Sequence, residues 1–246
     1  MTYCVGLRLN RGLLFMSDTR TNAGIDNISV FRKMFTWEQP GERVITLMTA
    51  GNLATTQALV SLLNERSKSP DERDPAILSE PSMFQIARLV GSTLNELIRT
   101  NATGEEQADA AFNATVILGG QIQGSAPRLF LIYPEGNFIE ASDETPFLQI
   151  GETKYGKPII VRAFDADMSF EDAAKLLLVS FDSTVKANLS VGLPLDLQTY
   201  ETDSFKRGIE RRFEADDPDY LTISSGWGDA LKLAFASLPA IELEES

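Results

Sequence analysis

The chain has 246 residues, 43% of them apolar, and 22 Lys and Arg stand against 35 Asp and Glu, for a net charge of −13. This length and composition fit one domain over residues 1–246 with a substantial core, and the acidity argues against nucleic acid or an anionic membrane as partner. There is no histidine, which excludes Ser-His-Asp and Cys-His hydrolases, imidazole bases and His-ligated zinc sites.

Cys4 is the only cysteine, so no intrachain disulfide can form. The N-terminal region lacks a basic segment followed by an apolar one, and no window approaches about 18 uninterrupted apolar residues. We therefore expect a cytoplasmic protein, and nothing in the residue pattern calls for a metal or cofactor.

The elements expected in chain order begin with strands. Alternating apolar residues fill the first fifty positions, and helical spacing follows in 52–65 and again after Ser82, a predicted N-cap. A polar loop with prolines, 67–75, separates the two helices. Short β-rich runs then occupy 111–150.

The second half is predicted to contain a helix over 170–187 that starts after Ser169, a strand over 195–200 and a last helix over about 228–237. We interpret the charged segment 206–219 as a solvated face or strand edge, and 240–246 as a frayed acidic tail. Strands, two helices, strands and a helix, in this order, favour an α+β fold: a four-layer αββα sandwich.

Thr2 is the first candidate for chemistry. Once Met1 is removed, this residue carries a hydroxyl and a free α-amine, so the amine can accept the hydroxyl proton without any histidine. The alternative is that a small residue simply follows an initiator methionine. Cys4 lies on the same strand face but has no such amine, and we expect it to pack in the core.

Two charged residues could complete such a site. Asp18 ends an apolar run, and Lys33 lies between apolar residues, so both can point inward. A lysine near Thr2 would lower the pKa of the α-amine, and the aspartate would keep that lysine charged and oriented. The alternative for either residue is a solvated surface charge.

Together these residues and several motifs resemble a proteasome β-type subunit of the N-terminal nucleophile (Ntn) hydrolase family. The segments that carry the resemblance are Thr2-x-x-Val5-Gly6, Ser17-Asp18-Thr19-Arg20, Lys33, Thr49-Ala50-Gly51, Val116-Ile117-Leu118-Gly119-Gly120 and Phe147-Leu148-Gln149-Ile150-Gly151. The chain start and the segment 151–158 look most like the bacterial Anbu (ancestral β subunit) branch.

The resemblance implies the αββα sandwich again and a catalytic set. Thr2 would be the nucleophile, Asp18 the orienting carboxylate, Lys33 the electrostatic partner and Gly51 the donor of an oxyanion-hole N–H. By the same resemblance Thr21 and Asn22 would bind an extended substrate through the backbone, as Gly51 would bind its carbonyl. The alternative for Gly51 is a plain strand-to-helix turn.

The sequence also departs from the family pattern. Lys33 lies about one residue nearer Thr2 than in typical proteasome subunits, so a bulge or shorter turn must compensate. Gly151-Glu152-Thr153 stands where those subunits have Gly-Ser-Gly, and 186–192 replaces their Asp-Ser-x-Ser-Gly stretch. Ser190 is the remaining hydroxyl that could help at the site.

Three functions are compatible with these residues: an N-terminal threonine peptidase, a catalytically weak scaffold subunit, and an amidase for small amides. The resemblance implies self-association of one subunit type into a ring-like or helical homo-oligomer. The substrate would be a peptide or a small amide, and no unfoldase partner can be inferred.

Overall fold

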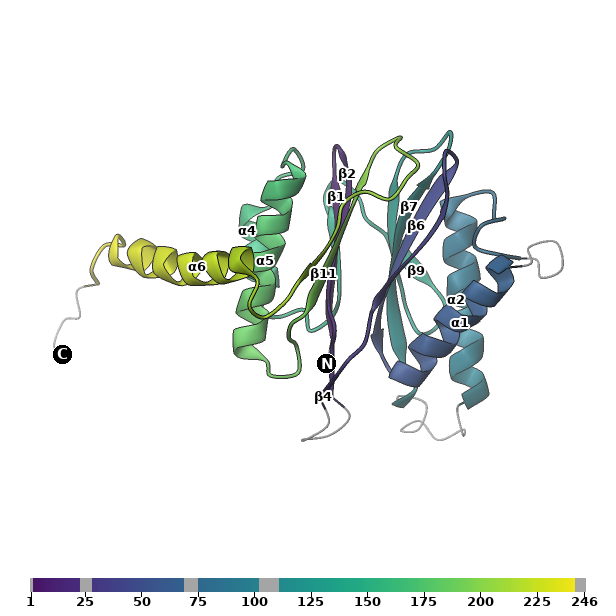
Figure 1. The fold of residues 1–246 in the computed structure, drawn as a ribbon, viewed down its shortest axis with the longest axis horizontal. Helices are drawn as coiled ribbons and strands as arrows, with labels where there is room; N and C mark the ends of the chain where they lie inside the picture. Colours follow the sequence, from purple (N-terminus) through teal and green to yellow (C-terminus); the bar gives the residue numbers. More distant parts are fainter. Residues whose placement is uncertain (1, 23–27, 69–74, 102–110, 242–246) are drawn as a thin grey trace.

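The computed structural model describes residues 2–22, 28–68, 75–101 and 111–241. Two β-sheets face each other, and helices cover the outer face of each (Figure 1). On one side the helices are α1 (Leu53–Lys68) and α2 (Met83–Asn101), and on the other they are α4 (Lys157–Ala163) and α5 (Phe170–Ala187). This is the expected four-layer αββα arrangement.

The first sheet has the order β10-β1-β2-β11-β12, with every neighbouring pair antiparallel. Its strands, in chain order, are β1 (Tyr3–Leu9), β2 (Gly12–Asp18), β10 (Phe147–Gly151), β11 (Leu195–Glu201) and β12 (Glu210–Phe213). The N-terminal strand β1 therefore lies inside the sheet, between β2 and β10, rather than at an edge.

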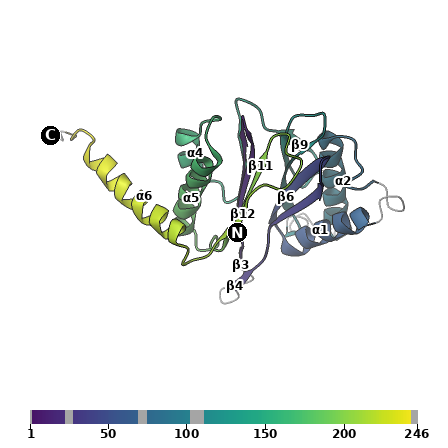
Figure 2. The same cartoon turned by 45° about the horizontal axis from the view of Figure 1, so that its top comes forward.

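The second sheet has the order β5-β6-β7-β8-β9, and it is also antiparallel. Its strands are β5 (Met34–Gln39), β6 (Arg43–Gly51), β7 (Ala114–Ile122), β8 (Arg128–Ile132) and β9 (Phe138–Glu140). A separate two-stranded ribbon, β3 (Arg20–Asn22) with β4 (Ile28–Val30), projects from the region between the sheets (Figure 2).

The core has three parts because each sheet is covered on both faces. Apolar side chains fill the space between the sheets and also the space between each sheet and its helices. The strand β2 is buried at all seven positions, since one face meets α5 and the other meets the second sheet. Its apolar run Leu13–Met16 reflects this two-sided burial.

Several expected helix boundaries are confirmed. The helix α5 spans Phe170–Ala187 as predicted, and Ser169 caps it by accepting a hydrogen bond from the backbone N–H of Asp172 at 3.0 Å. Ser82 likewise accepts from the N–H of Gln85 at 3.2 Å at the start of α2. Phe84, in the first turn of α2, is 42% exposed, although its ring contacts that of Phe138.

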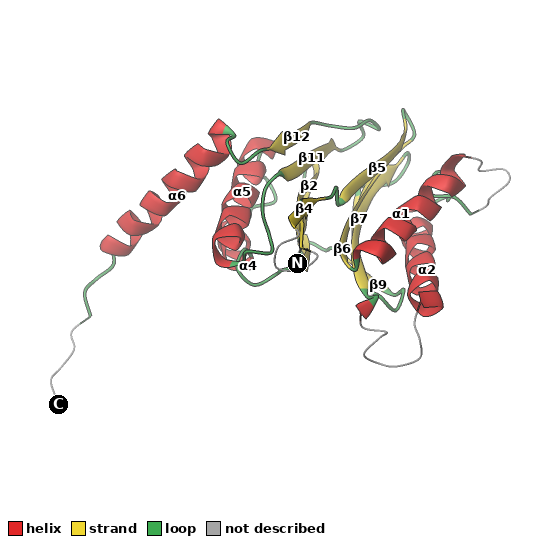
Figure 3. Cartoon of the chain, turned by 60° about the horizontal axis from the view of Figure 1, so that its bottom comes forward, coloured by secondary structure: helices red, strands yellow, loops and turns green. Residues whose placement is uncertain are grey.

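The C-terminal helix α6 (Pro218–Ala236) begins about ten residues earlier than predicted and extends away from the sandwich (Figure 3). It starts early because Asp217 caps it, accepting from the N–H groups of Asp219 and Tyr220. The charged segment 206–219 contains edge strand β12, which confirms the strand-edge interpretation. The short helix α4 was not predicted.

Part of the expected polar loop and most of the expected acidic tail lie outside the described residues, as does Met1. None of the helices within the described ranges combines the length and apolar character needed to cross a bilayer.

The buried face of α5 gives a test of the fold. Leu177 is fully buried against the first sheet, so Leu177→Ala should lower the free energy of unfolding by about 2–5 kcal/mol. The same change at Leu189, which is 86% exposed, should shift it by less than about 0.5 kcal/mol. Chemical denaturation of both variants at one protein concentration measures the difference, and equal losses would contradict the packing described here.

Candidate active site

Thr2 lies immediately before β1, where the chain passes between β2 and β10. It is half-buried, and its carbonyl oxygen accepts a hydrogen bond from the N–H of Glu152 at 2.6 Å. Gly151 allows this approach because its φ is +82° and a Cβ there would lie 1.9 Å from the Thr2 carbonyl oxygen. The end of β10 therefore fixes the backbone of Thr2.

Asp18 holds the other side of the same residue. The β1–β2 register pairs Cys4 with Ser17, which brings Asp18 next to Tyr3. The fully buried Asp18 accepts the backbone N–H of Tyr3 at Oδ1, at 2.9 Å. That N–H belongs to the Thr2–Tyr3 peptide bond, so this carboxylate orients the peptide unit attached to Thr2.

Lys33 completes a buried ion pair with Asp18. Its Nζ donates to Asp18 Oδ1 and to the carbonyl oxygen of Arg20, both at 2.7 Å, and the residue is only 5% exposed. Burial raises the pKa of Asp18, and the neighbouring ammonium of Lys33 opposes that rise. Neither residue is the solvated surface charge that was the alternative.

Between Thr2 and Lys33 the structure describes 2–22 and 28–33, so the expected bulge or shorter turn stays a prediction. Residues 31–33 form an irregular connection between β4 and β5, anchored on both sides by backbone hydrogen bonds. The N–H of Phe31 donates to the carbonyl oxygen of Thr19 at 2.9 Å, and the N–H of Thr49 donates to the carbonyl oxygen of Lys33 at 3.0 Å. In a strand, the side chain of Lys33 would have to follow the alternation of its neighbours. Because 31–33 are irregular, the side chain of Lys33 can point inward.

Thr2 and Lys33 open onto a cavity of about 350 Å³. Its wall is formed by Thr2, Thr21, Arg32, Lys33, Phe35, Thr49, Ala50, Gly51, Leu53, Thr56, Gln57 and Gly151. Four of the predicted site residues therefore share one cavity wall, and Asp18 lies behind them as the partner of Lys33.

Gly51 ends β6 at the edge of this cavity. Its φ is +116°, and a Cβ there would lie 2.4 Å from the carbonyl oxygen of Asn113. Two residues later α1 begins, with Asn52 Oδ1 accepting the N–H of Thr55 at 3.0 Å. Gly51 therefore makes the strand-to-helix turn and also exposes backbone at the cavity, so the two interpretations of this glycine are compatible.

The predicted substrate-binding residues lie in β3. One edge of β3 pairs with β4, Thr21 opposite Ser29 and Asn22 opposite Ile28, and its other edge has no strand partner within the described chain. Thr21 faces the cavity; the role of Asn22 stays a prediction. A peptide could thus pair with β3 only along the edge away from β4.

Ser190 is half-buried in the loop after α5 and does not line the cavity. Its N–H donates to Asn188 Oδ1 at 2.9 Å. Its role as a helper stays a prediction.

The structure adds a link that the sequence did not reveal. Glu152 is only 8% exposed, and its carboxylate accepts from Asn188 Nδ2 and from the N–H of Lys154, both at 3.0 Å. Because the N–H of Glu152 also binds the Thr2 carbonyl, this residue connects Thr2 with the loop after α5. Glu152 marked a departure from the family pattern, but no sequence signal pairs it with Asn188.

Cys4 is fully buried, and burial raises the pKa of its thiol well above its ordinary value. It therefore has the packing role expected of it. Across the described ranges no three His, Cys, Asp or Glu side chains are grouped so that they could hold a metal ion.

An αββα sandwich with these strand positions is the fold of proteasome-like Ntn hydrolases. Among solved structures, the chain is similar to an Anbu (ancestral β-subunit) protein from Yersinia bercovieri, with 48% identity, a TM-score of 0.91 and coverage of 98% of this chain and 100% of that one. It is also similar to an Anbu Gly-1 mutant from Hyphomicrobium sp. strain MC1, with 50% identity, a TM-score of 0.91 and coverage of 99% and 100%.

A third similar structure is described as the helical assembly of the Anbu complex from Pseudomonas aeruginosa, with 43% identity, a TM-score of 0.89 and 98% of both chains covered. No protein-family model and no curated protein sequence matches this chain. At this identity over nearly the whole chain, the protein belongs to the proteasome-like Anbu family.

The ion pair provides a test of the site's physical basis. Lys33→Met leaves the Asp18 carboxylate buried without its cation, so the free energy of unfolding should fall by about 3–5 kcal/mol. The double variant with Asp18→Asn removes both charges and should recover much of that loss. Denaturant titration measures both variants.

An exposed pair at the same distance gives a matched control. Lys175 and Asp172 are also 2.7 Å apart, but both side chains are more than half exposed, so Lys175→Met should leave stability nearly unchanged. If the loss of stability in the Lys33→Met/Asp18→Asn double variant equalled the sum of the losses in the two single variants, the Lys33–Asp18 pair would not act as a unit.

Proposed function

We propose that the protein is an N-terminal threonine amidohydrolase that cleaves peptides. The observation that carries the proposal is the buried Asp18–Lys33 pair hydrogen-bonded to the Thr2–Tyr3 peptide unit. This arrangement holds the peptide unit after Thr2, and Thr2 and Lys33 line one cavity that is large enough for a substrate side chain.

The chemistry follows from the groups on Thr2 itself. The α-amine accepts the proton of Oγ as Oγ bonds to the amide carbon, and the negative charge moves to the carbonyl oxygen. The backbone N–H of Gly51 stabilises that oxyanion. As the C–N bond breaks, the amine proton passes to the leaving nitrogen, and an acyl ester remains on Thr2.

Water completes the reaction. The neutral amine takes a proton from a water molecule while the water oxygen attacks the ester carbon. The acid is then released, and the amine returns the proton to Oγ. Lys33 supports both halves, because a nearby ammonium disfavours protonation of the amine and keeps it a base. Asp18 holds Lys33 in place, and Ser190 stays a candidate for a supporting hydroxyl.

The proposal requires a free amine on Thr2, and therefore cleavage of the Met1–Thr2 bond. An amide nitrogen at that position has no basic lone pair and could not accept the proton. Intact-mass measurement of the purified protein shows which form is present.

An extended peptide fits this site better than a compact small amide. The edge of β3 away from β4 offers backbone groups beside Thr21, and β-strand addition uses such groups without regard to side chains. A small amide would engage the cavity but not that edge.

The nucleophile is tested by reaction with a peptide epoxyketone, followed by mass mapping on the Met1-free chain. Wild type should gain one adduct on the N-terminal peptide, and Thr2→Ala should gain none and lose turnover by at least about a thousandfold. Thr2→Ser keeps a hydroxyl and an amine and should still react. Equal turnover by wild type and Thr2→Ala would overturn the assignment.

We also propose that α6 mediates self-association of this chain. The helix extends from the sandwich and exposes several large apolar side chains: Leu231, Leu233, Phe235 and, just beyond its end, Leu238 and Ile241. An exposed apolar surface of this kind is typical of an interaction site. A similar protein is described as forming a helical assembly, which supports a second copy as the partner.

Replacing Phe235, which is 79% exposed, tests this proposal without disturbing the core. Phe235→Glu should shift the protein to smaller species in size-exclusion chromatography with light scattering. Ser92→Glu adds the same charge at an exposed position on α2 and should leave the assembly unchanged. An unaltered assembly in Phe235→Glu would exclude α6 as the contact.

A further inference from the structure

We propose that Arg32 selects substrates that carry a carboxylate close to the amide being cleaved. The inference rests on the proposed function and names the substrate class of the same site. It starts from the position of Arg32, which is exposed and lines both the cavity next to Thr2 and a second cavity beside it.

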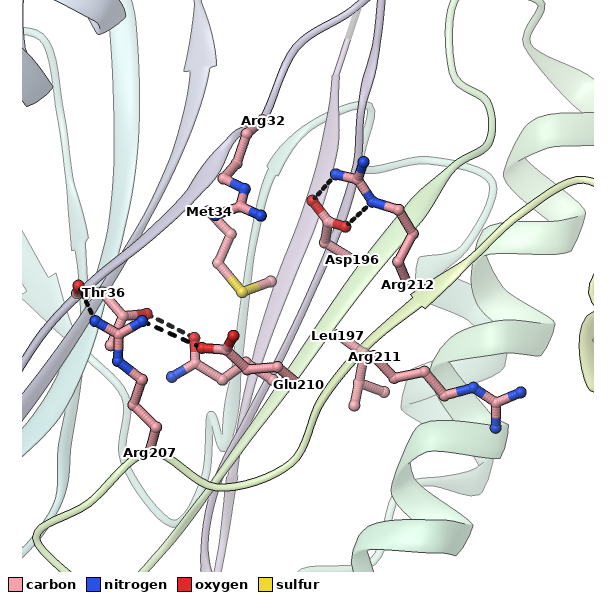
Figure 4. A pocket seen from close by; sticks show the side chains of 10 residues that line it. Arg32, Met34, Thr36, Asp196, Leu197, Arg207, Glu210, Arg211 and Arg212 are labelled. Atoms are coloured by element: carbon pink, nitrogen blue, oxygen red, sulfur yellow. Dashed lines mark hydrogen bonds and ion pairs between the residues drawn. The ribbon is translucent and has the colours of Figure 1, made fainter.

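The second cavity, also of about 350 Å³, lies between β5 and the β11–β12 hairpin (Figure 4). Four arginines line it, and three of them are held by carboxylates. Arg212 binds both oxygens of Asp196 at 2.7 and 2.9 Å, Arg207 pairs with Glu38 at 3.1 Å, and Arg211 pairs with Asp219 at 2.8 Å.

Arg32 differs from those three arginines. Within the described chain no carboxylate lies within ion-pair distance of its guanidinium, and Figure 4 marks no hydrogen bond or ion pair from its side chain to the other residues drawn. Asp196 lines the same cavity, but both of its oxygens are engaged by Arg212. Among the described residues, the positive charge of Arg32 therefore has no carboxylate partner.

The described wall of the cavity next to Thr2 is positively charged. Its wall contains two cationic residues, Lys33 and Arg32, and no Asp or Glu among the residues described. Lys33 is already committed to Asp18 and to the carbonyl oxygen of Arg20. In a chain of net charge −13, a cleft whose described wall carries a cation without a described carboxylate partner favours an anionic group on the ligand.

Backbone hydrogen bonds hold the chain on both sides of Arg32. Phe31 is tied to Thr19 and Lys33 to Thr49 by backbone hydrogen bonds, so the Cα of Arg32 cannot move far from the cavity. The guanidinium offers a planar pair of N–H groups that matches a carboxylate. An acidic side chain of a bound peptide can thus reach it while the neighbouring amide lies at Thr2.

The test uses peptide substrates in matched pairs. Each pair differs only by Glu or Gln, placed in turn at each of the three residues before the cleaved bond, and kcat/KM is measured at low and high salt. At one of these positions wild type should prefer Glu by about three- to tenfold, the range between an exposed ion pair and a charged hydrogen bond, and salt should reduce the preference.

Substitution of Arg32 separates charge from structure. Arg32→Gln should bring the Glu/Gln ratio of kcat/KM to about one, and Arg32→Lys should restore part of the preference. A wild-type enzyme that cleaves both peptides equally at all three positions, or an Arg32→Gln variant that keeps the preference, would overturn the proposal.

Binding without turnover distinguishes the two proposals. Calorimetry with the Thr2→Ala protein and the same peptides reports recognition alone. If no peptide is cleaved by wild type but the Glu peptide still binds Thr2→Ala more tightly, the proposed function fails and the role of Arg32 stands. If the Glu and Gln peptides bind equally, or neither binds, the role of Arg32 fails.

Discussion

The site depends on one buried ion pair, Asp18 with Lys33, and on its hydrogen bond to the peptide unit that follows Thr2. Two charges withdrawn from water at this depth are stable only when each is matched by the other and by further hydrogen bonds. The N–H of Tyr3 and the carbonyl of Arg20 supply those bonds, and Tyr3 is positioned by the register of β1 with β2 in the packed sheet. The packing of the sandwich thus determines the electrostatics at Thr2.

Backbone geometry, more than side-chain chemistry, shapes the rest of the cavity. Gly151 lets β10 approach the Thr2 carbonyl, and Gly51 turns the chain from β6 into α1 with its backbone facing the open space. Both glycines have a positive φ and a neighbouring backbone atom where a Cβ would lie, so any other residue would displace the wall. These two positions give the site its shape, and Glu152 ties that shape to the loop after α5 through Asn188.

The sequence could predict what depends on local pattern. The apolar run before Asp18 indicated that its side chain can point inward, and the cap at Ser169 gave the start of α5. It could not predict the Glu152–Asn188 contact, because residues 36 positions apart meet only through tertiary folding. The early start of α6 was hidden because the charges of 206–219 conceal the cap at Asp217 and Pro218. The lack of a described carboxylate partner for Arg32 could not be predicted either, because it depends on which carboxylates pair with the other arginines.

The ion pair also bears on the choice between an enzyme and a scaffold. In many proteins a buried ion pair can be replaced by apolar residues of similar volume with no loss of stability, so a fold by itself does not need one. Here Asp18 accepts a hydrogen bond from the peptide unit that follows Thr2, and Lys33 lines the cavity next to Thr2. If assembly uses the exposed apolar helix α6, as proposed above, it does not involve these charges, because α6 is remote from them (Figure 1). The cost of burying these charges is understandable if they act on chemistry at Thr2.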